Sequence, residues 1–209
     1  MPLITKADGT KFGKTEGGAV WLDPKKTSQY AFYQFWLNTA DADVYRFLQF
    51  FTFLPMEEIA AIKAADEARE GRPEAQQILA VEATRLVHGE EGLAAAQRIT
   101  QALFSGDLSD LSEQDLEQLK LDGLPSATVQ RDQLEGTPMT QLFAESGMVK
   151  SGKQVKDALG RNAVFFNGVA KGAGDNMNLP DCFSAQNALF GRFFLVKLGK
   201  KNHFLFEVV

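Results

Sequence analysis

The sequence predicts an α+β protein in which a mainly α-helical domain is followed by a small α/β domain. From Thr27 to about Gly106, apolar residues recur at three- and four-residue steps, which is typical of helices packed on a core. From Thr137 onward, helix caps and turn signals alternate with short apolar runs that favour strands. No strand–helix–strand pattern precedes the first helical segment, so no parallel βαβ sheet is expected there.

The composition is that of an ordinary folded chain. Of the 209 residues, 44% are hydrophobic and 23% are charged. No apolar run reaches the length of a membrane helix, and no signal peptide is recognisable. The single cysteine, Cys182, excludes an intramolecular disulfide and a cysteine zinc site, and is interpreted as a small filler residue. We therefore expect a cytoplasmic protein that does not contact a membrane.

The net charge of −5 is unevenly distributed. Residues 137–209 hold nine Lys or Arg against five Asp or Glu, a net charge of +4. Residues 1–136 hold thirteen against twenty-two, a net charge of −9. Binding to a phosphate backbone is therefore expected to concentrate at the C-terminal end.

Residues 1–26 carry two lysines in a glycine-rich loop, TKFGKTEGG, which runs from Thr10 to Gly18. Glycine allows a backbone to approach a ligand closely, and lysine is a mobile charge that reaches phosphate oxygens. Thr15 has a hydroxyl that is able to donate to a phosphate. The pattern suits a nucleotide polyphosphate, although an ordinary solvated loop has the same composition.

The flanking residues favour the first interpretation. The loop is preceded by PLITKADGT and followed by AVWLD, TSQY and FYQFWLNT. This run, over residues 2–55, resembles bacterial tyrosyl-tRNA synthetase, a class I aminoacyl-tRNA ligase. The segment from Lys11 to Thr15 is similar to that family's KMSKS signature. The resemblance implies catalytic roles for Lys11, Lys14 and Thr15, ATP binding by Lys14 and Gly13, and the substrates ATP and tyrosine.

Only ten residues precede Lys11, and neither His88 nor His203 stands in a His-x-Gly-His setting. A Rossmann-type catalytic domain is therefore absent from these 209 residues. We interpret the chain as the C-terminal portion of the enzyme, started artificially at Met1, inactive by itself and monomeric. The resemblance implies that the whole enzyme is a homodimer through the missing domain. Without that domain, we expect the loop near residues 9–18 to have nothing to dock on.

The helical domain is predicted over residues 27–122. Expected helices begin near Thr27, after Asp41, at Pro55 and at Pro73, and a fifth carries Leu93. Ser112 is expected to cap a short helix that ends near residue 123. The aromatic residues between 30 and 53 form either a core or a platform for anticodon bases, and helical spacing favours a core.

Some polar residues of this domain receive structural interpretations. His88 precedes Gly89, which is typical of a histidine at a helix end rather than of a ligand. Asp41 and Asp43 are interpreted as helix-start carboxylates on a solvated face. No metal-ligand spacing is recognisable among these residues.

Residues 123–136 are interpreted as a linker, and residues 137–209 as the second domain. Thr137 is expected to cap a helix whose first residue is Pro138. Ser151 and Gln154 are spaced as a capping box for the next helix, which Arg161 closes. A strand then ends in the turn Asn167-Gly168, and a hairpin over 193–209 turns through Gly199-Lys200-Lys201-Asn202.

The segment from Ser151 to Gly168, with the late hairpin, resembles the α-L RNA-binding domain that bacterial tyrosyl-tRNA synthetases carry. The resemblance implies that this domain contacts tRNA-Tyr. The candidate RNA-binding residues are Ser151, Lys153, Gln154, Lys156, Arg161, Asn167, Lys200 and Lys201.

Three functions remain open on the sequence. The first is the tRNA-binding portion of a tyrosine–tRNA ligase, the second a free-standing RNA-binding protein, and the third a protein-interaction module built on the aromatic helices. Only the first function needs the Lys11–Thr15 loop.

Overall fold

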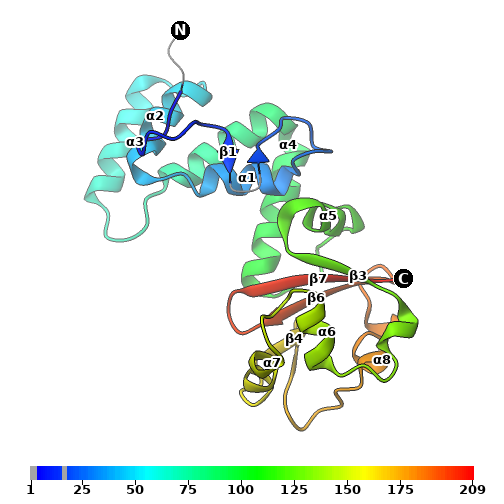
Figure 1. The fold of residues 1–209 in the computed structure, drawn as a ribbon. Helices are drawn as coiled ribbons and strands as arrows, with labels where there is room; N and C mark the ends of the chain where they lie inside the picture. The colour runs from blue at the N-terminus through cyan, green and yellow to red at the C-terminus, as the bar shows by residue number, and fades with distance from the viewer. Residues whose placement is uncertain (1–3, 16–17) are drawn as a thin grey trace. The chain divides into compact units, whose positions relative to one another are not determined.

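The computed structural model describes residues 4–15 and 18–209 (Figure 1). The chain forms two compact units, residues 1–98 and 99–209. We had expected the boundary near residue 122. It lies earlier, after Arg98, and the ion pair of Glu113 with Arg192 lies within the second unit.

Unit 1 consists of a short antiparallel hairpin and a set of helices. Its elements are β1 (Lys14–Thr15), β2 (Gly18–Ala19), α1 (Gln29–Leu37), α2 (Asp41–Phe51), α3 (Met56–Ala68) and the first part of α4 (Ala75–Ser105).

The predicted helices of unit 1 are present, with small shifts at their starts. Ser28 caps α1 by accepting a hydrogen bond from the amide of Ala31 at 3.0 Å. Pro55 is the residue before α3 rather than its first residue. Helix α4 contains the predicted fourth and fifth helices, which meet at Gly89, where φ is 69° and ψ is −176°. Glycine tolerates this conformation, so His88 stands at a helix end as predicted.

Unit 2 builds a sheet with helices around it. Its helical elements after α4 are α5 (Glu113–Gln118), the π-helix η1 (Leu119–Gly123), the 3₁₀ helix η2 (Arg131–Leu134), α6 (Met139–Glu145), α7 (Gly152–Leu159), α8 (Leu179–Cys182) and the 3₁₀ helix η3 (Ala185–Asn187). Its strands are β3 (Ser126–Val129), β4 (Val164–Phe166), β5 (Val169–Lys171), β6 (Phe193–Leu198) and β7 (Asn202–Val208).

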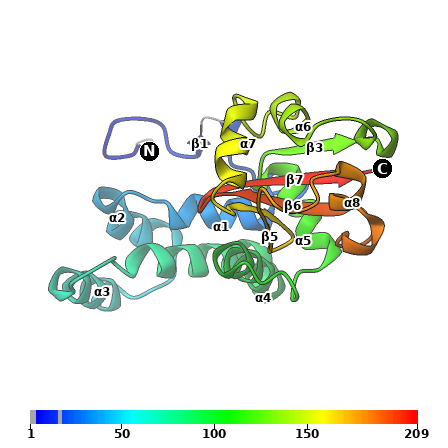
Figure 2. The ribbon, with the colours of Figure 1, turned by 90° about the horizontal axis from the view of Figure 1, so that it is seen from below.

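The sheet has the strand order β3-β7-β6-β4-β5. Its central pair is the predicted C-terminal hairpin, in which Phe193 pairs with Glu207 and Leu198 with Asn202. All neighbours are antiparallel except β3, which runs parallel to β7 along one edge (Figure 2). The predicted turn Asn167-Gly168 joins β4 to β5, and both residues have positive φ, as a type I′ turn requires.

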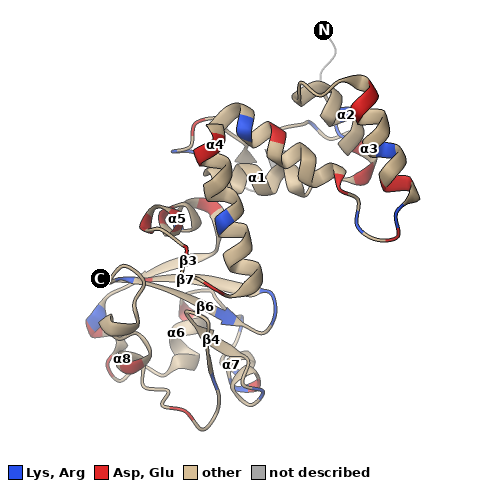
Figure 3. Cartoon of the chain, turned by 180° about the vertical axis from the view of Figure 1, so that it is seen from behind, with Lys and Arg blue, Asp and Glu red and all other residues tan. Residues whose placement is uncertain are grey.

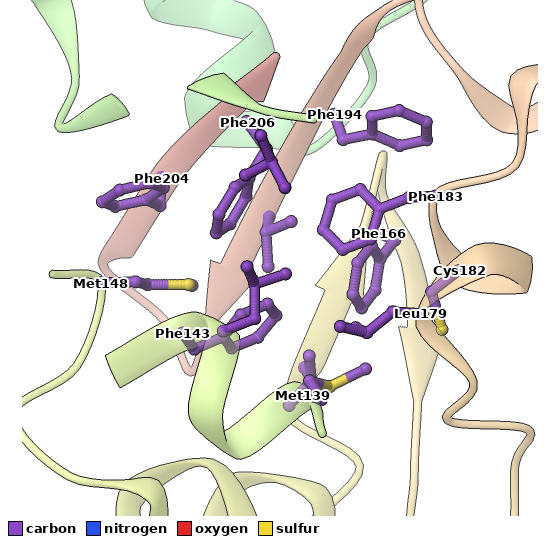
Figure 4. Close-up of a cluster of buried hydrophobic side chains, with 14 of the residues drawn as sticks. Met139, Phe143, Met148, Phe166, Leu179, Cys182, Phe183, Phe194, Phe204 and Phe206 are labelled. Atoms are coloured by element: carbon purple, nitrogen blue, oxygen red, sulfur yellow. The ribbon is translucent and has the colours of Figure 1, made fainter. Parts of the chain in front are cut away.

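Both faces of this sheet are covered, so β6 is apolar on both sides. Phe194 and Val196 belong to a core that α6, α7 and α8 close from one face, with Phe143 and Phe183 at its centre (Figure 4). Side chains alternate along a strand, so the equally buried Phe193 and Leu195 face the opposite side. Helix α5 and the end of α4 lie on that side (Figures 1 and 3).

The expected linker over residues 123–136 is instead part of the second unit. Residues 126–129 form β3, paired with residues 205–208 of β7, and η2 buries Leu134. The amide of Arg131 also donates to the carbonyl oxygen of Val209 at 2.9 Å. The polar composition that indicated a linker is that of an exposed sheet edge.

Candidate functional site

Six exposed cations gather around α7 and the turn between β6 and β7. We call this set the cationic rim: Lys150, Lys153, Lys156, Arg161, Lys200 and Lys201. Helix α7 is amphipathic, because Val155 and Ala158 are buried while Lys153 and Lys156 are exposed. The lysines of α7 therefore lie on the surface while its apolar stripe packs on the core.

The β6–β7 turn lies beside both ends of α7. The amide of Gly199 donates to the carbonyl oxygen of Ala163, just after α7, at 2.7 Å. The side-chain amide of Asn202 donates to the carbonyl oxygen of Met148, just before α7, at 3.3 Å. These two bonds bring Lys200 and Lys201 to the helix that carries the other predicted cations, on one side of the unit (Figure 3).

The start of α7 differs from the predicted capping box. Ser151 is the residue before the helix, but its side chain makes no capping hydrogen bond. Gln154 instead accepts from the amide of Lys150 at 2.9 Å, one residue earlier than a capping box requires. The interaction fixes the backbone at Lys150, a rim cation that sequence reasoning missed although it directly precedes Ser151.

Arg161 follows α7 rather than closing it, since Gly160 is the C-cap. Its Nε donates to the carbonyl oxygen of Asp157 at 3.1 Å, a common way of satisfying a helix end. Within the described part of the chain, no rim cation forms an ion pair. These charges are therefore available to an external anion.

Asn167, also predicted to bind RNA, is engaged within the fold instead. Its Oδ1 accepts from the amide of Leu195 at 2.7 Å and its Nδ2 donates to the carbonyl oxygen of Asn187 at 2.6 Å. It follows β4, whereas the rim lies at the other end of that strand, where Val164 pairs with Leu198. The structure therefore does not bring Asn167 together with the cationic rim.

Two further cations of unit 2 are also committed to the fold. Glu207 is buried and accepts from Lys120 Nζ at 2.6 Å and from Arg192 at 3.0 Å. The Lys120 hydrogen bond is the largest influence that lowers the pKa of this carboxyl below its ordinary value. Arg192 also pairs with Glu113 and Glu117 of α5. The network fastens α5 and η1 to β7.

The backbone of the predicted nucleotide loop is held by contacts with its flanking residues. Thr5 bridges Lys11 in antiparallel fashion, and the carbonyl oxygen of Gly13 accepts from the amide of Val20 at 3.0 Å. Lys11 is exposed. Lys14 and Thr15 form β1, but their side chains lie outside the described part of the structure, as do Glu16 and Gly17 of the loop.

The loop docks on unit 1, contrary to our expectation that it has nothing to dock on. Phe12 packs on the helical core, and its ring stacks on Phe51 with centroids 4.8 Å apart. An apolar residue between two lysines in a polar loop is the signal that sequence reasoning overlooked.

Asp43 is another correction, because it is 3% exposed rather than solvated. Its carboxylate accepts from the amide of Ala7 at 2.9 and 3.0 Å and from Arg46 at 2.8 Å. The helix-start position was correct, but the carboxylate binds a segment 36 residues earlier in the chain.

The described residues offer neither a metal site nor a membrane-spanning helix. No group of three or more His, Cys, Asp or Glu side chains in residues 4–15 and 18–209 is arranged to hold a metal ion. Among the described helices, none combines the length and the apolarity needed to cross a membrane.

Comparisons with known proteins divide the chain in a similar way. Residues 1–105 match the family model of tRNA synthetases class I (W and Y). Residues 115–206 match the model of the tyrosine–tRNA ligase SYY-like C-terminal domain, which includes the whole cationic rim.

Full-length relatives agree with these models. Tyrosine–tRNA ligase of Aliivibrio fischeri strain MJ11 is 56% identical over 96% of this chain and 45% of its own length. Its counterpart in Dechloromonas aromatica is 54% identical over 97% of this chain and 46% of its own length.

A solved structure, a C-terminally truncated mitochondrial tyrosyl-tRNA synthetase of Aspergillus nidulans, is 40% identical, with a TM-score of 0.39 over 41% of this chain and 25% of that one. The chain spans about 45% of the length of the full-length relatives. On the two family models and the curated relatives, the chain belongs to the class I tRNA synthetases, within the tyrosyl-tRNA synthetase family, and corresponds to their C-terminal portion.

Proposed function

We propose that this chain is the tRNA-binding portion of a tyrosine–tRNA ligase. The observation that carries the proposal is the cationic rim, which lies inside the segment matching the C-terminal domain of such ligases. In the complete enzyme, ATP and tyrosine react to tyrosyl-adenylate and pyrophosphate, and the tyrosyl group then passes to tRNA-Tyr with release of AMP. Dimerisation of the complete enzyme, which the resemblance implies, belongs to the same proposal.

The rim acts on the sugar–phosphate backbone of tRNA-Tyr. Lysine and arginine without internal ion pairs are suited to phosphate, and phosphate contacts position an RNA without reading its sequence. The chain is acidic as a whole, with a net charge of −5, so a local set of six cations determines where a polyanion approaches. We assign residues 137–209 to an α-L type RNA-binding domain on the same grounds.

The loop from Lys11 to Thr15 acts in adenylation as a KMSKS-type signature. Lys11 and Lys14 stabilise the negative charge that develops on the phosphates of ATP, and Gly13 lets the backbone approach the nucleotide. Thr15 contributes a hydroxyl hydrogen bond. This role distinguishes the proposal from a free-standing RNA-binding protein, which has no use for the loop.

A salt titration of tRNA-Tyr binding tests the role of the rim. Binding by the wild-type chain should weaken steeply with salt, with a slope near −0.9 per phosphate neutralised, taking duplex DNA as a rough guide. Replacing Lys153, Lys156 and Lys200 by alanine together should flatten the slope by about two to three units.

The matched control removes three exposed cations outside the rim, Lys25, Lys63 and Arg131. It changes the net charge equally and should leave the slope nearly unchanged. If the aromatic helices of unit 1 bound the RNA instead, both triple variants would keep the wild-type slope. That outcome would move the RNA site away from unit 2.

A further inference from the structure

The N-terminal loop is fastened to the helices of unit 1 by an aromatic ring. Phe12 lies against four other rings, with centroid separations of 4.8 Å to Phe51, 4.9 Å to Phe47, 5.5 Å to Trp36 and 5.6 Å to Phe35. Ile4 and Val20, on the two arms of the loop, pack against the same core. Apolar contacts therefore hold the loop on both sides of Lys11 and Lys14.

The helical core does not depend on Phe12 for its own contacts. Without it, Trp36 still lies 5.0 Å from Phe51, and Phe47 lies 5.7 Å from Phe51. A cavity of about 360 Å³, lined by Phe12, Gly13, Phe50 and other apolar residues, borders these rings. Removing the Phe12 side chain therefore enlarges an existing space rather than opening a close-packed interior. The Phe12 ring therefore stabilises the loop more than it stabilises the helical core.

A buried carboxylate makes the second attachment. Asp43 of α2 accepts from the amide of Ala7 with both oxygens, at 2.9 and 3.0 Å, and from Arg46 at 2.8 Å. Arg46 also donates to the carbonyl oxygen of Thr5. Charge-assisted hydrogen bonds of this kind are stronger than neutral ones. One ion pair thereby holds the backbone on both sides of Lys6.

Lys11 lies between the two attachments. It forms an antiparallel bridge with Thr5, whose carbonyl is held by Arg46, and it directly precedes Phe12. The side chain of Lys11 is exposed while its neighbour is packed. A loop held in this way loses less conformational freedom when its lysines engage a ligand.

We propose that Phe12, Asp43 and Arg46 are positioning residues for the adenylation step. They hold the loop so that its lysines reach the phosphates of ATP in the transition state. The inference rests on the proposed function, because it needs an adenylating enzyme. It adds that the helical unit, beyond any role in binding tRNA, sets the geometry of the nucleotide loop.

The test uses the complete enzyme and tyrosine-dependent exchange of pyrophosphate into ATP. Phe12→Ala should lower kcat by about 10- to 100-fold, the range expected when a reacting group is displaced by about an ångström. The Kd for tyrosine should not change, since Phe12 does not act in the tyrosine pocket. Asp43→Asn should give a smaller loss of kcat, because asparagine keeps one of the two oxygen acceptors.

Two matched controls lie in α2, the helix that carries Asp43. Phe50→Ala removes an aromatic ring from the same cavity, but Phe50 contacts Phe51 at 6.5 Å and, among the described residues, makes no ring contact with Phe12. Asp41→Asn removes a carboxylate from the same first turn, one that hydrogen-bonds Gln76 rather than the loop. Both should keep the wild-type kcat. Phe12→Met, a flexible apolar replacement, should recover most of the rate.

Two readouts separate positioning from a folding defect. Transfer of tyrosine from preformed adenylate to tRNA-Tyr no longer involves the triphosphate, so it should be unaffected by Phe12→Ala. In the 209-residue chain by itself, the two tryptophans, Trp21 and Trp36, both lie in unit 1, so unfolding of the Phe12→Ala variant followed by tryptophan fluorescence should show that its helices are folded.

The outcomes also separate this inference from the proposed function. If Phe12→Ala and Phe50→Ala have the same kcat while Lys14→Ala abolishes adenylation, only the positioning role is overturned. Parallel losses in adenylation and in transfer have the same meaning, because they indicate a general defect. A wild-type enzyme without tyrosine-dependent exchange overturns the proposed function and this inference with it.

Discussion

The N-terminal loop and the cationic rim both carry lysines, but they are held in different ways. The rim stands on regular elements, the helix α7 and a hairpin turn, and two backbone-directed hydrogen bonds bring these together. The loop has little regular structure and depends on the Phe12 ring and the Asp43 carboxylate. The lysines of the rim are therefore held by secondary structure, whereas those of the loop are held by a few side-chain contacts.

The difference predicts how each region responds to substitution. On the proposed function, each rim cation adds a modest, salt-sensitive contribution to polyanion binding, and its neighbours remain in place when it is lost. On the proposed function, a loop lysine acts at one position in one transition state, so no neighbouring residue replaces it when it is lost. Effects should accordingly be large and specific in the loop, and small and roughly additive in the rim.

The largest effect is expected for Lys14→Ala and Lys11→Ala in the complete enzyme. Each should lower adenylation by about 2–4 kcal/mol of transition-state stabilisation, by analogy with a lost oxyanion donor. The affinity for tyrosine should change little. Thr15→Ala should cost less. Pyrophosphate exchange and tyrosine binding, measured on the same preparations, check this. Near-normal pyrophosphate exchange in the variant that lacks both Lys11 and Lys14 would mean that the loop is no more sensitive to substitution than the rim.

The ion-pair network of Glu207 should stabilise unit 2 alone. Glu207→Gln is expected to cost about 1–3 kcal/mol, because it leaves Lys120 and Arg192 without their shared carboxylate. Hydrogen exchange of β6 and β7 should accelerate, while tryptophan fluorescence, which reports unit 1, stays the same. The exposed Glu135→Gln serves as the control.

The same carboxyl gives this contribution a pH dependence. Its pKa is lowered from the ordinary value of 4.5, so the contribution is present above pH 4.5 and is lost as the pH falls through the folded-state pKa. Glu207→Gln should remove this part of the acid sensitivity of β6 and β7. An unchanged acid profile would mean that the network does not fasten α5 to the sheet.

His88 should make unit 1 sensitive to a higher pH range. Burial lowers its pKa from 6.5, its ring packs edge-on against Phe32 at 4.8 Å, and its Nε2 is among the buried atoms without a hydrogen-bond partner in the described structure. The neutral form is favoured in the fold, so stability is present above pH 6.5 and declines as the pH falls below it. His88→Leu should abolish this decline, as followed by tryptophan fluorescence.

The smallest effects concern helix caps. Ser28→Ala and Ser112→Ala should each cost about 1 kcal/mol, because both hydroxyls accept a backbone hydrogen bond at the start of a helix. Ser151→Ala should cost almost nothing, since its side chain makes no such bond. Urea unfolding and hydrogen exchange of the three variants check the order. A large loss at Ser151 would restore the capping box that the sequence predicted.

The elements that sequence reasoning predicted well are those with local signals. Helical spacing around Trp36, the capping residue Ser112 and the turn Asn167-Gly168 each determine the chain within a few residues. The rim was largely predictable for the same reason, since its cations lie on α7 and in one turn.

The features that the sequence did not predict depend on partners that are distant in the sequence. Strand β3 is short and polar, and it forms a strand because it pairs with β7, about eighty positions later in the chain. Asp43 resembles any acidic residue in a first helical turn, and only the fold brings it to Ala7. The turn at Asn167 was predicted correctly and its RNA contact stays a prediction, but its two hydrogen bonds to Leu195 and Asn187 are not readable from the sequence.

The parallel pairing of β3 with β7 has a consequence for the order in which the chain acquires its structure. Unit 1 has all of its residues once position 98 has been synthesised. The sheet of unit 2 has to wait, because its central strands β6 and β7 are the last to be made and β3 pairs with the later of them. Contacts this far apart in the sequence form slowly, and domains generally fold as units in order of synthesis. On the ribosome, the helical unit therefore folds first, and the sheet of unit 2 closes only when the final strand emerges.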